Sequence, residues 1–351
     1  MIKLSDYIFK YLASYGVRHV FMLTGGGAMH LNDSIGKEKR IQYICNHHEQ
    51  ACAIAAEGYA RVSGKIGVVS VTTGPGGTNA VTGILGQWLD SIPALCISGQ
   101  VRFDTTVAST GLPLRQLGDQ EINIVDIVRP ITKYAFMVTE PQSIRFHLEK
   151  AIHLATSGRP GPVWLDIPLN VQAAMIDEQS IQGYIPTGDD KIEFDDNKIE
   201  NTVKIVVDKI KAAKRPVILA GAGIRLGGAY DIFQKVVEKL SIPVLTAWDA
   251  IDLMHEEHPF YFGRPGTLGQ RGANFIFQNA DLLLSLGCTL NTRQIGFNFD
   301  SVARAAYKII LDIDSNELAK QTIRPDLPIH CDVRPFLEVM NKKLNAGPLP
   351  H

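Results

Sequence analysis

YICNHHEQACAIAAEGYARVSGKIGVVSVTTGPGGTNAVTG, residues 43–83, is the stretch that decides the fold. An alanine-rich segment is followed by a short apolar run at residues 66–71 and then by the glycine-rich turn TTGPGG. An apolar run without alternation is typical of a strand that is buried on both faces of a parallel sheet. A glycine-rich turn from such a strand into a helix points backbone N–H groups at whatever lies above the carboxyl edge of the sheet. The stretch therefore predicts an α/β fold with a candidate binding site after the strand.

The same pattern extends in both directions and predicts two α/β domains. Residues 1–175 make up the first domain and residues 202–345 the second, and each contains several short apolar runs. Residues 176–201 carry acidic residues, glycine and proline with little apolar periodicity, which indicates a linker. Because the runs lack alternation and are separated by helical stretches, we expect two doubly wound parallel-sheet domains.

The composition is that of an ordinary globular protein. Hydrophobic residues make up 45% of the chain, and the formal net charge is −1 with no block of like charges. This balance does not favour binding to nucleic acid or to an anionic membrane surface. The five cysteines form no CxxC pair, which argues against a disulfide framework and a structural zinc site. No apolar stretch approaches the roughly 20 residues that span a bilayer, and no signal peptide is recognisable, so we expect a cytoplasmic protein.

Long segments of the chain resemble one family of enzymes. The run from Glu49 through EGYARVSGKIGVVSVTTGPGGTN resembles the pyrimidine-binding domain of thiamine-diphosphate-dependent enzymes, notably acetolactate synthases. Residues 157–172, SGRPGPVWLDIPLNVQ, resemble the end of that domain. Residues 215–229, RPVILAGAGIRLGGA, and residues 309–320, IILDIDSNELAK, resemble the Rossmann-like central domain of the same enzymes. The resemblance covers the chain from residue 4 to about residue 344.

The resemblance implies a catalytic role for Glu49. In this family the corresponding glutamate hydrogen-bonds N1′ of the aminopyrimidine of thiamine diphosphate, and the cofactor then serves the decarboxylation of a 2-oxo acid such as pyruvate. Without the resemblance, Glu49 is a carboxylate at the head of an alanine-rich helix, where it simply complements the helix dipole. The implied activity is that of a 2-oxo-acid lyase or carboligase, which is a transferase of acyl groups.

Further site residues follow from the same resemblance. Gln120 is implied as a second catalytic residue, but Asp119 precedes it where acetolactate synthases have phenylalanine. A different acyl acceptor, such as a keto-sugar, therefore stands beside pyruvate. His47 and His48 adjoin Glu49 and are either structural or close to the cofactor. The residues implied to bind the cofactor lie in or just after two glycine-rich turns: Gly25, Gly26, Gly27, Thr73, Gly74, Pro75, Gly76 and Asn79.

The central domain resembles the part of acetolactate synthases that holds FAD in a structural role. The residues implied to contact such a nucleotide are Gly221, Gly223, Arg293, Asp312 and Asp314. Related enzymes keep this domain without any nucleotide, and GAGIRLGG departs from the GxGxxG fingerprint of dinucleotide sites. An occupied and an empty central domain both stay open.

One motif of the family does not occur in the sequence. Full-length members carry a GDG motif followed by asparagines in a third domain that binds magnesium and the diphosphate, and no GDG occurs here. We therefore expect the metal ligands on a missing domain or a partner chain, and poor binding of thiamine diphosphate by this chain alone. Three interpretations stay open: a subunit of a split enzyme, an inactive truncated product, and a nucleotide-binding or regulatory module without catalysis. We also expect a homo-oligomer formed through the first domain.

Overall fold

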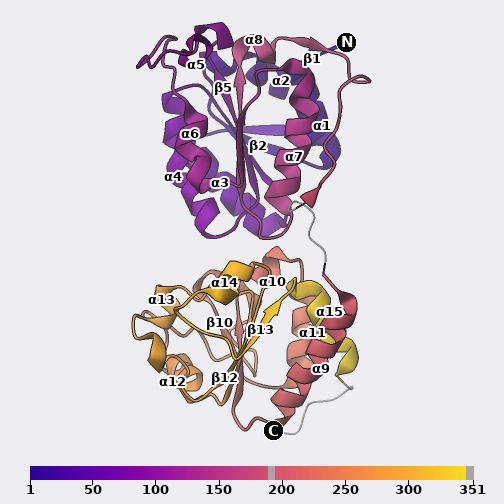
Figure 1. Ribbon diagram of the computed structural model, residues 1–351, viewed down its shortest axis with the longest axis vertical. Helices are drawn as coiled ribbons and strands as arrows, with labels where there is room; N and C mark the ends of the chain where they lie inside the picture. The colour runs from indigo at the N-terminus through magenta and orange to yellow at the C-terminus, as the bar shows by residue number, and fades with distance from the viewer. Residues whose placement is uncertain (189–193, 345–351) are drawn as a thin grey trace. The chain divides into compact units, whose positions relative to one another are not determined.

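The computed structural model describes residues 1–188 and 194–344. These residues belong to two units, Met1–Ile192 and Glu193–His351. Each unit is built on its own parallel sheet with helices on both faces (Figure 1), which confirms the prediction of two doubly wound domains. The predicted linker falls partly at residues 189–193 and the predicted second domain ends at residue 345, and these positions lie outside the described residues.

The main sheet of the first unit has six parallel strands in the order β3-β2-β4-β5-β7-β6. The order reverses between β2 and β4, and ligands of doubly wound sheets bind at such a switch point, outside the carboxyl ends of the strands. A short antiparallel pair joins β1 to β8. The strands are β1 (Ile2–Lys3), β2 (His19–Met22), β3 (Gln42–Cys45), β4 (Gly67–Val71), β5 (Ala94–Gln100), β6 (Tyr134–Met137), β7 (Pro162–Pro168) and β8 (Met175–Ile176).

Two groups of helices cover the two faces of this sheet. One core contains side chains of α1, α2 and α7, and the other contains side chains of α3, α4 and α6, while successive residues of the central strands alternate between the two cores. The short α5 and α8 follow β5 and β7. The helices are α1 (Leu4–Tyr15), α2 (Met29–Lys37), α3 (Glu49–Ser63), α4 (Pro75–Leu89), α5 (Val107–Thr110), α6 (Ile124–Val128), α7 (Ile144–Thr156) and α8 (Leu169–Gln172).

The second unit has five parallel strands in the order β10-β9-β11-β12-β13, so its switch point lies between β9 and β11. The strands are β9 (Pro216–Ala220), β10 (Val244–Thr246), β11 (Leu282–Leu286), β12 (Tyr307–Asp312) and β13 (Leu327–His330). The helices are α9 (Asp196–Ala212), α10 (Gly223–Leu226), α11 (Tyr230–Leu240), α12 (Arg271–Asn279), α13 (Thr292–Ile295), α14 (Ser315–Ala319) and α15 (Val333–Lys343).

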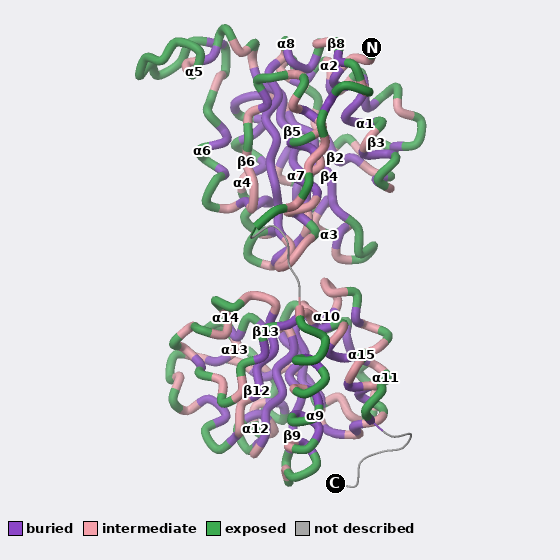
Figure 2. Tube along the Cα trace, turned by 45° about the vertical axis from the view of Figure 1, so that its right-hand side comes forward, coloured by how far each residue is buried: buried purple, intermediate pink, exposed green. Residues whose placement is uncertain are grey.

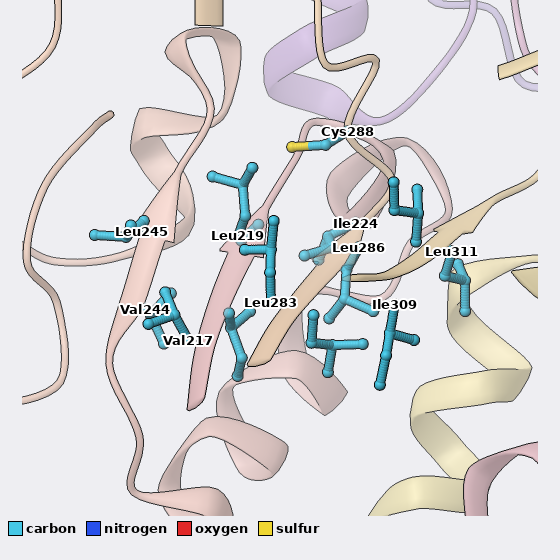
Figure 3. Close-up of a cluster of buried hydrophobic side chains, with 14 of the residues drawn as sticks. Val217, Leu219, Ile224, Val244, Leu245, Leu283, Leu286, Cys288, Ile309 and Leu311 are labelled. Carbon is cyan, nitrogen blue, oxygen red and sulfur yellow. The ribbon is translucent and has the colours of Figure 1, made fainter. Parts of the chain in front are cut away.

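Aliphatic side chains from the strands fill the core of each unit. Buried residues follow the central strands in both units (Figure 2). In the second unit, side chains of neighbouring strands pack side by side around β9 and β11, as Figure 3 shows for Val217, Leu219, Leu283, Leu286, Ile309 and Leu311. Throughout residues 1–188 and 194–344, no helix has both the length and the apolar character needed to cross a bilayer.

Close contact between α3 and α4 depends on Gly83. A Cβ at this position would lie 2.5 Å from Cβ of Ala53 and 3.2 Å from the backbone nitrogen of Ile54. Gly83 lies on α4. Gly58 lies on α3, and a Cβ on Gly58 would meet no atom within 4 Å. Glycine at position 83 therefore sets the distance between the two helices.

We expect Gly83→Ala to lower the free energy of unfolding by about 1–3 kcal/mol, because overpacking forces the two helices apart. The matched control Gly58→Ala removes a glycine from a helix interior without a clash and should raise the free energy of unfolding by about 0.5–1 kcal/mol. Urea unfolding followed by circular dichroism measures both changes. Equal effects of the two substitutions would contradict the packing argument.

Candidate functional site

The loops that follow β2 and β4 cross at the switch point of the first unit. A Cβ on Gly25 would lie 2.5 Å from Cβ of Thr72, and a Cβ on Gly27 would lie 2.9 Å from Cγ2 of Thr73. Side chains at these two glycines would push the loops apart. The structure thus brings the two predicted glycine-rich turns together at the sheet edge where ligands of such folds bind.

Gly27 is also enclosed from β5 and α8. A Cβ on Gly99 would lie 2.1 Å from the carbonyl oxygen of Gly27, and Nε2 of the buried Gln172 donates a hydrogen bond of 2.7 Å to the same oxygen. Gly26 differs from its neighbours because no atom lies within 4 Å of its Cβ position. Of the three predicted glycines in this turn, two are therefore required by packing, and the third faces open space.

Glu49 is the first residue of α3 and its side chain is held at the same edge. The residue is only 7% exposed, and its Oε2 accepts a hydrogen bond of 3.0 Å from Nδ2 of Asn79 on α4. Its Oε1 lies 3.5 Å from the position that a Cβ on Gly76 would occupy. The buried carboxyl group of Glu49 thus lies next to Gly76 at the carboxyl edge of the sheet. Such a carboxyl group can exchange a proton or hydrogen bond with a ligand placed there.

Thr72 lies at the centre of this group, although the sequence pointed to its neighbour Thr73. Atoms of Thr72 lie within 2.7 Å of the Cβ positions of Gly25 and Gly76. Its hydroxyl oxygen is buried and has no hydrogen-bond partner in the part of the chain that the structure describes. A buried polar group without a partner is uncommon and is typical of a position where a ligand or water supplies the partner.

Thr73 turns its hydroxyl group into the protein. Its Oγ1 donates a hydrogen bond of 2.6 Å to Oε1 of Gln100, and both residues are buried. Pro75 occupies the first turn of α4, where its missing N–H is tolerated. In this structure both predicted residues shape the turn.

Gln120 is brought to the turn through its backbone. Gly74 has φ 58° and ψ −115°, which are close to the values at the first central position of a type II′ turn, where glycine is preferred. A Cβ on Gly74 would lie 2.1 Å from the carbonyl oxygen of Gln120, whose own φ is 57°. The side chains of Gln120 and Asp119 are exposed.

Glu121 fastens the loop that precedes Gln120. Its Oε1 accepts a hydrogen bond of 2.5 Å from the backbone N–H of Val107, and its Oε2 accepts hydrogen bonds from the backbone N–H groups of Leu117 and Gly118. One carboxyl group thus holds both ends of the segment 107–118. Three leucines of this segment, Leu112, Leu114 and Leu117, are exposed.

The two histidines before Glu49 differ in what the structure assigns to them. His48 is the N-cap of α3, and its Nδ1 accepts a hydrogen bond of 3.1 Å from the backbone N–H of Gln50. This contact gives His48 a structural role. His47 is exposed.

At the switch point of the second unit, two predicted glycines serve a close crossing of loops. A Cβ on Gly221 would lie 2.0 Å from the carbonyl oxygen of Gly287, and a Cβ on Gly223 would lie 2.8 Å from Cα of Gly287. The N–H of Gly221 already donates to Leu286 O and the N–H of Gly223 to Gly287 O. These two amides are therefore not available to a phosphate group.

The other predicted nucleotide contacts lie at the end of β12 and on the segments that follow β11 and β12. Asp312 is buried, and its Oδ1 accepts a hydrogen bond of 2.9 Å from the N–H of Asp314, which in turn caps α14. Arg293 lies on α13, and its carbonyl oxygen accepts a hydrogen bond of 2.9 Å from the N–H of Thr267. Within the described ranges, no group of three or more His, Cys, Asp or Glu side chains is placed to hold a metal ion.

Comparisons with known proteins agree with the layout of the two units. Residues 2–127 match the family model described as thiamine pyrophosphate enzyme, N-terminal TPP binding domain. Residues 203–340 match the model described as thiamine pyrophosphate enzyme, central domain.

Several curated relatives of the chain are named as acetolactate synthases. It is 35% identical over 336 residues to the acetolactate synthase large subunit of Lactococcus lactis, covering 95% of this chain and 56% of the relative. It is 34% identical over 342 residues to a probable acetolactate synthase large subunit of Methanocaldococcus jannaschii, covering 96% and 55%. For the isozyme 3 large subunit of Escherichia coli the identity is 32% over 352 residues, covering 98% and 58%. The chain thus spans just over half the length of these relatives.

Gly74→Ala tests the contact between the turn and Gln120. We expect the substitution to lower the free energy of unfolding by roughly 3 kcal/mol, because strain and a clash with a backbone oxygen add together. Gly111→Ala is the matched control, since Gly111 has φ 65° but no atom within 4 Å of its Cβ position. It should cost only about 1 kcal/mol, from the left-handed conformation alone. Urea unfolding of both variants measures the difference, and equal losses would show that Gln120 does not press on the turn.

Proposed function

Because the chain belongs to the thiamine pyrophosphate enzyme family, we propose that Glu49 binds the aminopyrimidine ring of thiamine diphosphate in the decarboxylation of a 2-oxo acid. The observation that carries this proposal is the position of the Glu49 carboxyl group. Its Oε2 accepts a hydrogen bond from Asn79, and its Oε1 lies beside Gly76 in the first turn of α4.

The residues around Glu49 fit a flat ring with hydrogen-bonding edges. Gly25 and Gly76 carry no side chains, and Gly26 faces open space. The buried hydroxyl group of Thr72 is a further polar group that a ligand can satisfy. Small residues next to a single buried carboxyl group are what a planar heterocycle requires, since the ring needs area for contact and one polar partner at its edge.

Glu49 has two tasks in this proposal. Its carboxyl group would bind the edge of the ring and would share a proton with a ring nitrogen. Asn79 donates to Oε2 and so fixes the rotation of the carboxyl group. The bound cofactor supplies a carbon nucleophile and an electron sink for decarboxylation. The protein's part at this edge is to orient the ring and to hold the proton.

We propose that the diphosphate and its magnesium ion are bound by protein residues outside this sequence, on the same polypeptide or on a partner chain. Mg²⁺ prefers carboxylate, carbonyl and phosphate oxygens in octahedral geometry. The two matched family models describe the N-terminal and central domains. A domain that supplies oxygen ligands would complete the site at Glu49.

We also propose that two copies of the chain associate through α3 and α4. Both helices expose large apolar side chains: Ile54, Val62, Leu85, Trp88 and Leu89. Contiguous exposed apolar residues on helices are typical of protein–protein interfaces. Such an interface would involve the two helices that also carry Glu49 and Asn79.

Glu49→Gln tests the catalytic proposal in the assembly that contains the diphosphate-binding domain. We expect the rate of CO₂ release from pyruvate to fall by about 100-fold or more, because glutamine cannot share an acidic proton with the ring. Glu57→Gln on the same helix is the control, and it removes only an ion pair with Arg61. Its rate should stay within about twofold of the unaltered protein, since partly exposed ion pairs contribute little.

The assay includes a keto-sugar as a second acceptor beside pyruvate, because Asp119 is exposed next to Gln120. Calorimetric titration with thiamine diphosphate and magnesium gives the affinity of each variant. Equal activity of the Glu49→Gln and Glu57→Gln variants would contradict the role of Glu49. Absence of binding to the complete assembly would favour the non-catalytic module over the enzyme.

For the second unit we propose that FAD binds at the carboxyl edge of its sheet. The amides of Gly221 and Gly223 do not fit a phosphate-binding role, because both already donate to backbone carbonyls. The loop after residue 263 and α13 fit better. A backbone hydrogen bond from Thr267 to Arg293 joins the two segments, which carry Arg264 and Arg293, and the guanidinium group of Arg264 lies over the ring of Trp248.

We expect Arg293→Ala to weaken the binding of FAD by about 10-fold, since a hydrogen bond to a charged group contributes roughly 1.5–3 kcal/mol. Arg304→Ala is the control, because Arg304 is also exposed but lies outside these loops. Titration of the chain with FAD, followed by the flavin fluorescence, measures both affinities. Unchanged affinity in both variants, or no binding at all, would remove FAD from the proposal.

A further inference from the structure

A buried chain of hydrogen bonds runs behind the site and centres on Asp166 of β7. Asp166 is fully buried, and its Oδ1 accepts a hydrogen bond of 2.5 Å from Oγ of Ser98 on β5. Its Oδ2 accepts a hydrogen bond of 3.0 Å from Nε2 of Gln100. The indole N–H of Trp164 donates to Oγ of Ser98 at 2.8 Å. All four side chains are buried.

The directions of these hydrogen bonds are fixed by the groups that take part. The indole N–H of Trp164 can only donate, so Ser98 accepts from it and gives its own proton to Asp166. Oε1 of Gln100 accepts a hydrogen bond of 3.0 Å from the backbone N–H of Val101. This contact fixes which atom of the amide is oxygen, so a flip of the Gln100 amide is excluded. Its Nε2 must then face an acceptor, and an ionised Asp166 supplies one.

Gln100 connects this buried carboxylate to two segments of the site. Its Oε1 accepts from the hydroxyl of Thr73, in the turn that contains Gly74. Its Nε2 also donates to the carbonyl oxygen of Ile122 at 3.0 Å, two residues after Gln120. The turn and the Gln120 segment press against each other at Gly74. One glutamine side chain therefore ties both sides of that contact to β7.

We propose that Asp166 is a positioning residue of the cofactor site: it orients Gln100, which holds the glycine-rich turn at Thr73 and the Gln120 segment at Ile122 in register. The effect on the cofactor rests on the proposed function, whereas the effect on the two segments does not. Burial, partly offset by the hydrogen bonds from Ser98 and Gln100, raises the pKa of Asp166 to about 7. The measurements are therefore made at pH 8.5, where the carboxyl group is ionised.

Asp166→Asn tests the proposal with almost no change of shape. Asparagine can accept from Ser98, but its NH₂ group then faces the NH₂ group of Gln100, and two donors repel each other. We expect amide hydrogen exchange in the segments 72–77 and 118–124 to accelerate by about 10-fold without any cofactor present. Ile167→Val is the control, because Ile167 is a fully buried neighbour on β7 that is outside the hydrogen-bond chain. It should change exchange evenly over the first unit.

The double variant Asp166→Asn with Gln100→Glu reverses the pair, so that the new amide donates to the new carboxylate. We expect slow exchange to return in the segment 72–77, since Thr73 can still donate to residue 100. Exchange in the segment 118–124 should stay fast, because Ile122 loses its donor. The proposal is overturned if Asp166→Asn and Ile167→Val give the same pattern, or if the double variant does not restore the segment 72–77.

The affinity for magnesium and thiamine diphosphate separates this inference from the proposed function. In the complete assembly, Asp166→Asn should weaken cofactor binding by about 10-fold, and Ile167→Val should leave it within twofold. If the unaltered protein binds no cofactor while the exchange pattern is as expected, the proposed function fails and the positioning role stands. If Asp166→Asn binds the cofactor as tightly as the unaltered protein, the link from Asp166 to the cofactor site is overturned.

Discussion

The crossing of the loops after β2 and β4 is the constraint on which the first unit depends. At the switch point of a parallel sheet, the connections that leave two neighbouring strands run in opposite directions, and ligands bind in the crevice between them. Here the loop after β2 lies so close to Thr72, to Thr73 and to β5 that Gly25, Gly27 and Gly99 have no room for a Cβ. The N-terminal parts of α3 and α4 meet at the same edge, where Asn79 donates a hydrogen bond to Glu49. The candidate site is thus a consequence of how the sheet is wound.

The second unit solves the same problem at Gly221, Gly223 and Gly287. Its strand order reverses in the same way, and its loops also cross without side chains. The result is different, because the backbone amides of Gly221 and Gly223 bond to carbonyl groups, and the nearby buried carboxyl group of Asp312 accepts a hydrogen bond from the N–H of Asp314. Equal topology therefore does not give equal chemistry. The chemistry depends on which side chains stand at the start of the helices that follow.

Sequence reasoning was effective where the signal was local. The apolar runs indicated parallel strands, and the glycine-rich turns indicated the switch point. The resemblance pointed to Glu49 and Asn79, which the structure places 3.0 Å apart. It did not separate Thr72 from Thr73, because the two hydroxyl groups differ only in which side of the turn they face. Nor did it identify Asp166 and Gln100, because these two hydrogen-bonded residues are 66 positions apart in the chain. The hydrogen-bond partner of a polar residue inside a strand cannot be inferred until the neighbouring strand is known.

The carboxyl group of Glu121 has a consequence for how this protein can diversify. A single side chain closes the segment 107–118 by bonding to backbone amides near both of its ends. Backbone N–H groups are present in nearly every residue type, so the closure does not depend on what the segment between them is made of. Its exposed leucines at 112, 114 and 117 are therefore free to change without loss of the anchor. The side chains of this segment can therefore be replaced, in evolution or by design, while the core stays the same.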